Sequence, residues 1–181
     1  MTPAILDYAK LIIWDLDGTF WNGIFGEEGA QFRSDMLEIV IELNKHGIIS
    51  AIASNNDLAP TREYLKRNAA WEHFVFPVID WRSKTDMVRA IISNTQLRPQ
   101  NTIFLDDTPR WRELVAKEIP ELLLTCDADD FVTAYQNWAR DRPFNDVAME
   151  RLQSYKLLER RQTLRHTYAT TPEATIEFLR V

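Results

Sequence analysis

A short apolar segment near the N-terminus runs directly into two carboxylates, within IIWDLDGTFW at residues 12–21. A continuous apolar run predicts a strand buried on both faces, and Asp15 and Asp17 then lie at its carboxyl end. Neighbouring carboxylates resist joint ionisation unless a cation lies between them, so the pair indicates a Mg²⁺ site. A plain Asp-Gly turn after a strand also fits these residues, so the stretch alone leaves both interpretations open.

Apolar segments and amphipathic segments alternate along most of the chain. We predict further strands at residues 48–54, 74–80, 102–105 and 122–125, with helices at 34–46, 61–68, 85–95, 109–117 and 128–140. This alternation favours an α/β fold with a doubly wound parallel sheet. Ligands of such sheets bind beyond the carboxyl ends of the strands.

A set of polar residues falls at those strand ends or in the turns just beyond them: Asp15, Asp17, Ser54, Lys84, Asp106 and Asp107. Acids scattered at random over loops would not repeatedly fall at the same edge of a sheet. We therefore favour a binding site at this edge, in which one carboxylate attacks an electrophile while another moves protons.

Composition narrows the class of partners. The 181 residues are 45% hydrophobic, which is enough for one domain with a real core. A net charge of −6 and the lack of a basic stripe argue against nucleic-acid binding. No apolar run approaches the ~20 residues of a membrane span. We therefore expect no membrane partner. The single cysteine, Cys126, excludes an internal disulfide framework, so we expect a cytoplasmic protein.

The segments between the predicted strands are short. Residues 20–32 place glycines among apolar residues, which predicts a small hairpin or flap. Residues 20–53 and 55–83 leave no room for a further cap domain, so the site is expected to be open to a bulky or protein-borne substrate. After Pro143 the chain becomes rich in charged, helix-forming residues. We divide it into a core at residues 1–143 and a helical extension at residues 144–181, with helices at 146–168 and 172–179.

Four motifs together resemble those of the haloacid dehalogenase (HAD) superfamily of phosphotransferases: DLDGT at 15–19, the strand-terminal Ser54, Lys84 at a helix start, and the pair Asp106-Asp107. Longer segments resemble the FkbH-like subfamily (subfamily IIIC), which supplies glyceryl units to polyketide assembly lines: DLDGTFWNGIFGEEG, IASNND, DWRSK, FLDDTPRWREL and MERLQSYKLLERRQ. The resemblance covers nearly all of residues 10–180. It implies the HAD-like Rossmannoid fold with a minimal cap, and Mg²⁺ as the cofactor.

The resemblance also implies roles for the acidic residues. Asp15 would be the nucleophile that takes the phosphoryl group. Asp17 would be the general acid and base, and its main-chain carbonyl would be a Mg²⁺ ligand. Asp106 would complete the metal site beside Asp15, and Asp107 would orient it or hold Lys84.

The remaining motif residues are implied to contact the substrate. Ser54 and Lys84 would bind the oxygens of the transferring phosphoryl group, which carry negative charge that hydroxyl and ammonium donors stabilise. Thr19 and Asn55 are further candidates for contact with the substrate, and Asn55 serves equally well as a turn residue.

The activity that the resemblance implies is Mg²⁺-dependent removal of phosphate from 1,3-bisphosphoglycerate, a phosphorylated three-carbon substrate, and loading of the glyceryl unit on an acyl carrier protein. Two alternatives stay open: a plain phosphatase of the same fold, and a non-catalytic interaction domain. Subfamily members commonly continue into an acyltransferase-like domain where this sequence stops, so a fragment and a short free-standing member are both considered. A thioester relay on the enzyme would need Cys126, although a buried small hydrophobe is the commoner role of a lone cysteine.

Overall fold

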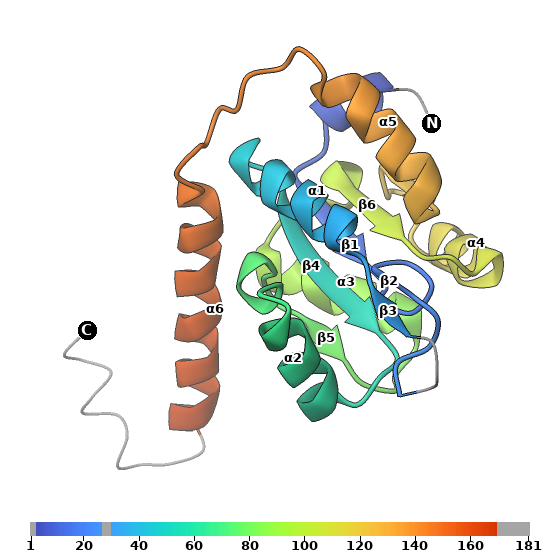
Figure 1. Ribbon diagram of the computed structural model, residues 1–181. Helices are drawn as coiled ribbons and strands as arrows, with labels where there is room; N and C mark the ends of the chain where they lie inside the picture. Colours follow the sequence, from blue (N-terminus) through green and yellow to red (C-terminus); the bar gives the residue numbers. More distant parts are fainter. Residues whose placement is uncertain (1–2, 27–29, 170–181) are drawn as a thin grey trace.

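Five parallel strands form the central sheet of the computed structural model, which describes residues 3–26 and 30–169 (Figure 1). Their order across the sheet is β5-β4-β1-β6-β7. The strands are β1 (Leu11–Trp14), β4 (Ile49–Ser54), β5 (Val78–Ile79), β6 (Thr102–Leu105) and β7 (Leu124–Cys126). The chain builds the sheet from β1 through β4 to β5, and then returns to add β6 on the other side of β1. The topological switch point, where such sheets bind ligands, therefore lies beside β1.

Both faces of the sheet are covered, since every residue of β1, β4 and β6 is buried. Ile13 pairs with Ala51 of β4 and Phe104 of β6, and these three side chains belong to one core cluster. Ile12 and Trp14 point to the opposite face and belong to the second cluster. This alternation follows from the two-residue period of a strand.

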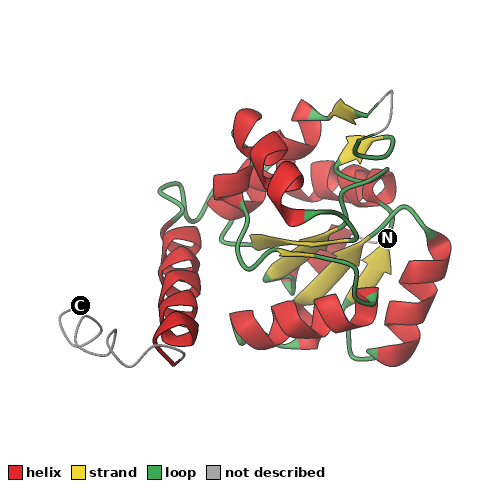
Figure 2. Cartoon of the chain, turned by 90° about the horizontal axis from the view of Figure 1, so that it is seen from below, coloured by secondary structure: helices red, strands yellow, loops and turns green. Residues whose placement is uncertain are grey.

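Helices cover the two faces, as the edge-on view of the sheet shows (Figure 2). One face packs against α1 (Ser34–Lys45), α2 (Leu58–Arg67) and α5 (Ala128–Ala139). The other face packs against α3 (Lys84–Thr95) and α4 (Pro109–Glu118). Single turns of 3₁₀ helix occur at η1 (Pro3–Asp7), η2 (Trp71–His73) and η3 (Pro99–Asn101). The predicted doubly wound α/β architecture is confirmed.

The predicted flap is a two-stranded antiparallel hairpin between β1 and α1. It pairs β2 (Trp21–Asn22) with β3 (Gln31–Phe32), and Trp21 lies opposite Phe32. Its aromatic side chains pack against Tyr64 of α2, with the Trp21 and Tyr64 rings 5.5 Å apart at 87°. In the described part of the chain, the segments flanking β4 contain helices and this hairpin but no cap domain.

Some predicted boundaries are wrong. The strand expected at residues 74–80 is reduced to β5, because Phe76 adopts a left-handed backbone (φ +46°) and Pro77 lacks an N–H for the ladder. The helix expected from residue 61 begins at Leu58, since Pro60 is tolerated in the first turn of a helix. Helix α1 begins at Ser34 as predicted, and its N-cap, Arg33, makes no side-chain capping bond.

The predicted extension forms α6 (Glu150–Ala169), which lies beside the core in Figure 1. Leu152 is 2% exposed and belongs to the core cluster of α3 and α4. Glu159 accepts a hydrogen bond from the main-chain N–H of Phe76 at 3.0 Å. The first helix of the extension is therefore packed on the core, whereas the helix expected at residues 172–179 lies outside the described residues.

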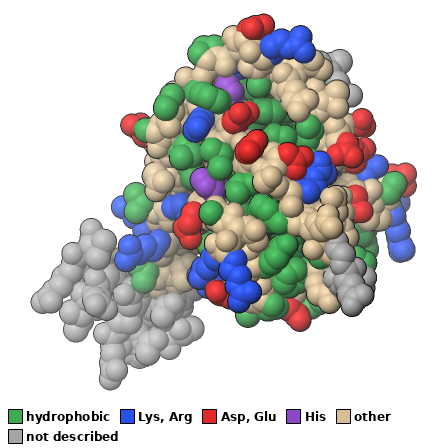
Figure 3. Space-filling view, in the orientation of Figure 1, with side chains coloured by type: hydrophobic (Ala, Val, Ile, Leu, Met, Phe, Trp, Pro, Cys, Tyr) green, Lys and Arg blue, Asp and Glu red, His purple; other side chains and the backbone are tan. Residues whose placement is uncertain are grey.

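On the face that Figure 3 shows, acidic and basic side chains are interspersed with one another. No helix among the described residues combines the length and the apolar character needed to cross a membrane.

Candidate active site

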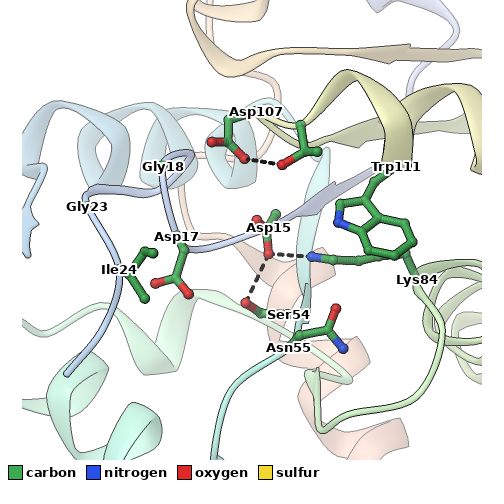
Figure 4. Close-up of a pocket in the computed structure, with 11 residues that line it drawn as sticks. Asp15, Asp17, Gly18, Gly23, Ile24, Ser54, Asn55, Lys84, Asp107 and Trp111 are labelled. Carbon is green, nitrogen blue, oxygen red and sulfur yellow. Dashed lines mark hydrogen bonds and ion pairs between the residues drawn. The ribbon is translucent and has the colours of Figure 1, made fainter. Parts of the chain in front are cut away.

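A cavity of about 450 Å³ opens at the carboxyl edge of the sheet, beside the switch point (Figure 4). Residues from the ends of β1, β4 and β6, from the flap and from the starts of two helices line it: Asp15, Asp17, Gly18, Gly23, Ile24, Ser54, Asn55, Lys84, Asp107, Thr108 and Trp111. Most of the residues singled out in the sequence therefore lie around one cavity.

Asp15 lies directly after β1 and is 6% exposed. Its Oδ1 accepts hydrogen bonds from Ser54 Oγ at 2.9 Å and from Lys84 Nζ at 2.5 Å, and Figure 4 shows both side chains converging on it. Lys84 is 3% exposed and also donates to the carbonyl of Ala53 at 3.0 Å. One buried oxygen of Asp15 is thus held between a hydroxyl and a cation.

Three carboxylates crowd together beside this contact. Asp15, Asp106 and Asp107 each offer an oxygen within 4.8 Å of the others. Asp106 is fully buried, and its Oδ1 accepts from the N–H of Thr108 at 2.9 Å. Its Oδ2 has no aligned hydrogen-bond donor among the described residues, although Lys84 Nζ forms an ion pair with it at 3.3 Å.

The electrostatics of this group favour a cation. Burial raises the pKa of Asp15, and the charge of Lys84 opposes that shift. Burial, and then the charge of Asp15, raise the pKa of Asp106 to about 6. One lysine does not balance three nearby carboxylates, and hard divalent cations prefer carboxylate oxygens. The three carboxylates, and Asp106 Oδ2, which has an ion pair but no aligned hydrogen-bond donor, therefore fit a divalent cation held by Asp15, Asp106 and Asp107.

Asp17 also lines the cavity, but both of its side-chain oxygens accept hydrogen bonds from neighbouring residues. Oδ1 accepts from Trp21 Nε1 at 2.7 Å and from the N–H of Phe25 at 2.8 Å, and Oδ2 accepts from Asn56 Nδ2 at 3.0 Å. The side-chain oxygens of Asp17 are thus outside the group of three carboxylates. Metal binding through the main-chain carbonyl of Asp17 stays a prediction.

Asp107 does not hold Lys84, contrary to one of its two expected roles, because Asp15 and Asp106 are the ion-pair partners of that lysine. The Asp107 carboxylate instead lies against Gly18, whose φ of +67° allows a tight turn. A Cβ at Gly18 would come within 2.8 Å of Asp107 Cγ. The glycine of the DLDGT motif therefore leaves room for the third carboxylate.

Thr19 and Asn55 have structural contacts. Thr19 is fully buried and is not among the residues that line the cavity; its hydroxyl accepts from the N–H of Asp107 at 3.0 Å. Asn55 lines the cavity, and its amide nitrogen donates to the carbonyls of Asp80 at 3.1 Å and Arg82 at 3.0 Å. Thr19 thus joins the loops after β1 and β6, and Asn55 anchors the loop that leads to Lys84.

Cys126 ends β7 and is 8% exposed. Burial is the main cause that raises the pKa of its thiol to about 12, followed by the charges of Asp127 and Asp130. It is not among the described residues that line the cavity. The local environment therefore disfavours the thiolate that a relay would need.

Sequence reasoning did not predict the contacts that several residues of the site make. Trp21 and Asn56 bond the Asp17 carboxylate, Ile24 and Trp111 line the cavity, and Arg112 donates to the carbonyls of Asp106 at 2.7 Å and Asp107 at 2.9 Å. Their positions next to the motifs are visible in the sequence. The directions of their side chains depend on loop geometry, and no sequence signal would have identified their contacts.

The chain has the HAD-like Rossmannoid fold, which solved structures of similar architecture identify. The N-terminal part of the protein BF1531 from Bacteroides fragilis contains a phosphatase domain and was crystallised with Mg. It is 26% identical to this chain with a TM-score of 0.64. The match covers 72% of this chain and 40% of that one, so the chain spans less than half the length of this relative.

Two further structures agree on the fold. The 3-deoxy-D-manno-octulosonate 8-phosphate phosphatase of Moraxella catarrhalis, in complex with magnesium, phosphate and KDO, is 14% identical with a TM-score of 0.54, over 76% of this chain and 94% of that one. A structure described as a HAD-superfamily (subfamily III A) hydrolase from Legionella pneumophila is 12% identical with a TM-score of 0.57, over 86% and 93%. No protein-family model and no curated protein sequence matches the chain.

These neighbours confirm the coarse part of the sequence interpretation. The fold is that of the HAD phosphatases, and Mg²⁺ is bound in the Bacteroides and Moraxella structures, as expected of the cofactor. The FkbH-like assignment is a finer statement that these neighbours do not address.

Proposed function

We propose that this chain is a Mg²⁺-dependent phosphatase in which Asp15 attacks the phosphorus of a phosphorylated substrate. The observation that carries the proposal is the position of Asp15, at the end of β1 and at the cavity, between Ser54 Oγ and Lys84 Nζ. Phosphoryl transfer requires an aligned nucleophile and dense positive charge around the transferring oxygens, with little other chemistry. This arrangement supplies both requirements.

Each neighbouring residue has a role in the proposed reaction. Ser54 and Lys84 hold the phosphoryl oxygens and keep Asp15 in place. Asp17 donates a proton to the leaving group and later accepts one from the water that hydrolyses the aspartyl phosphate. Asp15, Asp106 and Asp107 would hold Mg²⁺, together with the main-chain carbonyl of Asp17. When bound, the ion reduces the repulsion between the anionic nucleophile and the anionic phosphate.

The test is phosphate release from a panel of phosphate esters and acyl phosphates, measured with Mg²⁺ and with a chelator. The panel includes 3-deoxy-D-manno-octulosonate 8-phosphate, because a structural neighbour is a phosphatase of that sugar acid. Asp15→Asn keeps the shape of the side chain and removes the nucleophile, so we expect turnover to fall by about 10⁴-fold or more. Phosphate release that survives Asp15→Asn or the chelator would refute the proposal, and a fully inactive panel would favour the non-catalytic interaction domain.

A finer proposal is that the enzyme is FkbH-like and loads a glyceryl unit from 1,3-bisphosphoglycerate on an acyl carrier protein in the cytoplasm. The motifs around the site support it, and so does the cavity, which has a flap but no cap domain in the described part of the chain. We further propose residues 1–143 as the catalytic core and 144–181 as an extension, of which helix α6 packs on that core.

Intact-protein mass spectrometry tests the finer proposal. A phosphopantetheinylated carrier protein is incubated with the chain, Mg²⁺ and fresh 1,3-bisphosphoglycerate, beside an Asp15→Ala control. A glyceryl-sized mass gain that disappears in the control supports acyl transfer. Phosphate release without that gain indicates a plain phosphatase.

A further inference from the structure

The carboxylate of Asp17 is fixed by donors from two separate segments. Trp21 Nε1 and the N–H of Phe25 lie on the flap and both bond Oδ1, at 2.7 Å and 2.8 Å. Asn56 Nδ2 lies just before α2 and bonds Oδ2 at 3.0 Å. Because hydrogen bonds weaken steeply with distance and angle, donors on both oxygens define the direction of the carboxylate.

The two side-chain donors are themselves immobilised by packing. Trp21 is fully buried, and its ring contacts Phe25 at 5.6 Å and Tyr64 at 5.5 Å between centroids. Asn56 is 7% exposed. A phenyl ring would fill most of the space of the indole, so packing alone does not require a tryptophan at position 21. The indole N–H adds a hydrogen bond to Asp17 that a phenyl ring could not make.

The same contacts lead to the proposed nucleophile. Asn56 Nδ2 also lies 3.2 Å from Ser54 Oγ, which donates to Asp15 Oδ1 at 2.9 Å. Asn56 therefore sets the distance between the proton-transfer residue and the residue that would attack phosphorus. Misplacement of a reacting group by about 1 Å costs on the order of 100-fold in rate.

We propose that Trp21 and Asn56 are positioning residues that aim Asp17 at the oxygen between phosphorus and the leaving group. The inference rests on the proposed function. As Asp15 forms its bond to phosphorus, the bond from phosphorus to the leaving oxygen breaks, its electron pair stays on that oxygen, and the proton of Asp17 passes to it. When water then attacks phosphorus and the bond to Asp15 breaks, the water returns a proton to Asp17.

This positioning sets the class of substrate that the site hydrolyses well. A phenol or alcohol is a poor leaving group without a proton, so phosphate monoesters depend on an aligned Asp17. The carboxylate released from an acyl phosphate leaves without protonation. Loss of either positioning residue should therefore slow the transfer of phosphate from monoesters to Asp15 far more than the transfer from acyl phosphates.

The experiment compares the rate at which phenol leaves phenyl phosphate and acetate leaves acetyl phosphate in the first turnover, at saturating substrate and Mg²⁺. This step precedes the attack of water, which uses Asp17 whichever substrate was bound. Trp21→Phe removes the N–H and keeps a ring, and we expect the first-turnover rate of leaving-group release to fall about 10- to 100-fold for phenyl phosphate and less than about threefold for acetyl phosphate. Trp138→Phe is the matched control, since Trp138 Nε1 donates to Asp7 Oδ1 at 2.9 Å beside a different cavity. It should leave both rates unchanged.

Asn56→Ala provides a second variant from the other side of the carboxylate, which keeps the test decisive if Trp21→Phe folds poorly. It should show the same selective loss. Equal losses on the two substrates, or no loss on either, would overturn the positioning role and leave the proposed function intact. Wild-type protein without phosphate release that depends on Asp15 and Mg²⁺ would overturn both.

Discussion

Comparison of Gly18→Ala with Gly47→Ala separates the cost of backbone strain from the effect of displacing the Asp107 carboxylate. Gly18 has φ +67° and Gly47 has φ +71°, so alanine at either position adopts the same left-handed backbone. That conformation costs an L-residue roughly 1–2 kcal/mol. A Cβ at Gly18 would clash first with Asp107 Oδ2 and would lie 2.8 Å from Asp107 Cγ, whereas at Gly47 the nearest atom is Asn145 Oδ1 at 3.6 Å, an ordinary contact.

The steric part of the effect is confined to Gly18. Carbon atoms in contact settle at about 3.5–4.0 Å, so the Asp107 carboxylate must move by about 1 Å in Gly18→Ala. That movement takes one oxygen out of the group that it forms with Asp15 and Asp106. We expect both variants to lose about 1–2 kcal/mol of unfolding free energy without metal, and only Gly18→Ala to bind Mg²⁺ at least about tenfold more weakly, or about 1.4 kcal/mol.

The assay pairs urea unfolding in a chelator with calorimetric titration of Mg²⁺ for wild type, Gly18→Ala and Gly47→Ala. Unchanged Mg²⁺ affinity in Gly18→Ala, together with equal destabilisation of the two variants, would show that Asp107 is not part of the metal-binding group. Weaker Mg²⁺ binding in Gly47→Ala as well would mean that strain alone disturbs the site.

Three further predictions concern the charged site and the thiol. The pKa of Asp106 is raised from 3.8 to about 6, so ionisation of this carboxyl costs the folded, metal-free protein about 3 kcal/mol. The unfolding free energy should therefore fall as pH rises from about 4 to 6, and Mg²⁺ should remove that fall. A metal-free unfolding free energy that does not change with pH would contradict the reasoning. Lys84→Met leaves buried carboxylates without their cation, so we expect a loss of roughly 3–5 kcal/mol in denaturant unfolding at pH 7 without metal, partly restored by Mg²⁺; a loss under about 1 kcal/mol would refute the role of Lys84 as counter-ion. A Cys126 pKa of about 12 leaves a thiolate fraction of roughly 10⁻⁵ at pH 7. Iodoacetamide should therefore alkylate the native protein far more slowly than the unfolded chain, as measured by mass spectrometry. Cys126→Ser should retain phosphate release.

The sequence by itself determined the fold class and the edge that holds the site. Apolar runs and the polar residues that follow them are local features, and parallel strands necessarily bring their carboxyl ends to one edge. Asp15, Ser54 and Lys84 could therefore be grouped without a structure, and their side chains are in direct contact. The pairing of β5 was overestimated, because the left-handed backbone of Phe76 has no signal in the residue type.

The tertiary structure alone decided how the polar side chains of the loops are used. Thr19 points into the protein and joins two loops, and Asp107 joins the carboxylate group rather than holding Lys84. Trp21 and Asn56 donate to different oxygens of Asp17 only because the flap and the residues before α2 both lie next to it. Sequence spacing specifies which residues reach a strand end, but the direction of each side chain depends on the backbone angles and packing of its loop, which many distant contacts determine together.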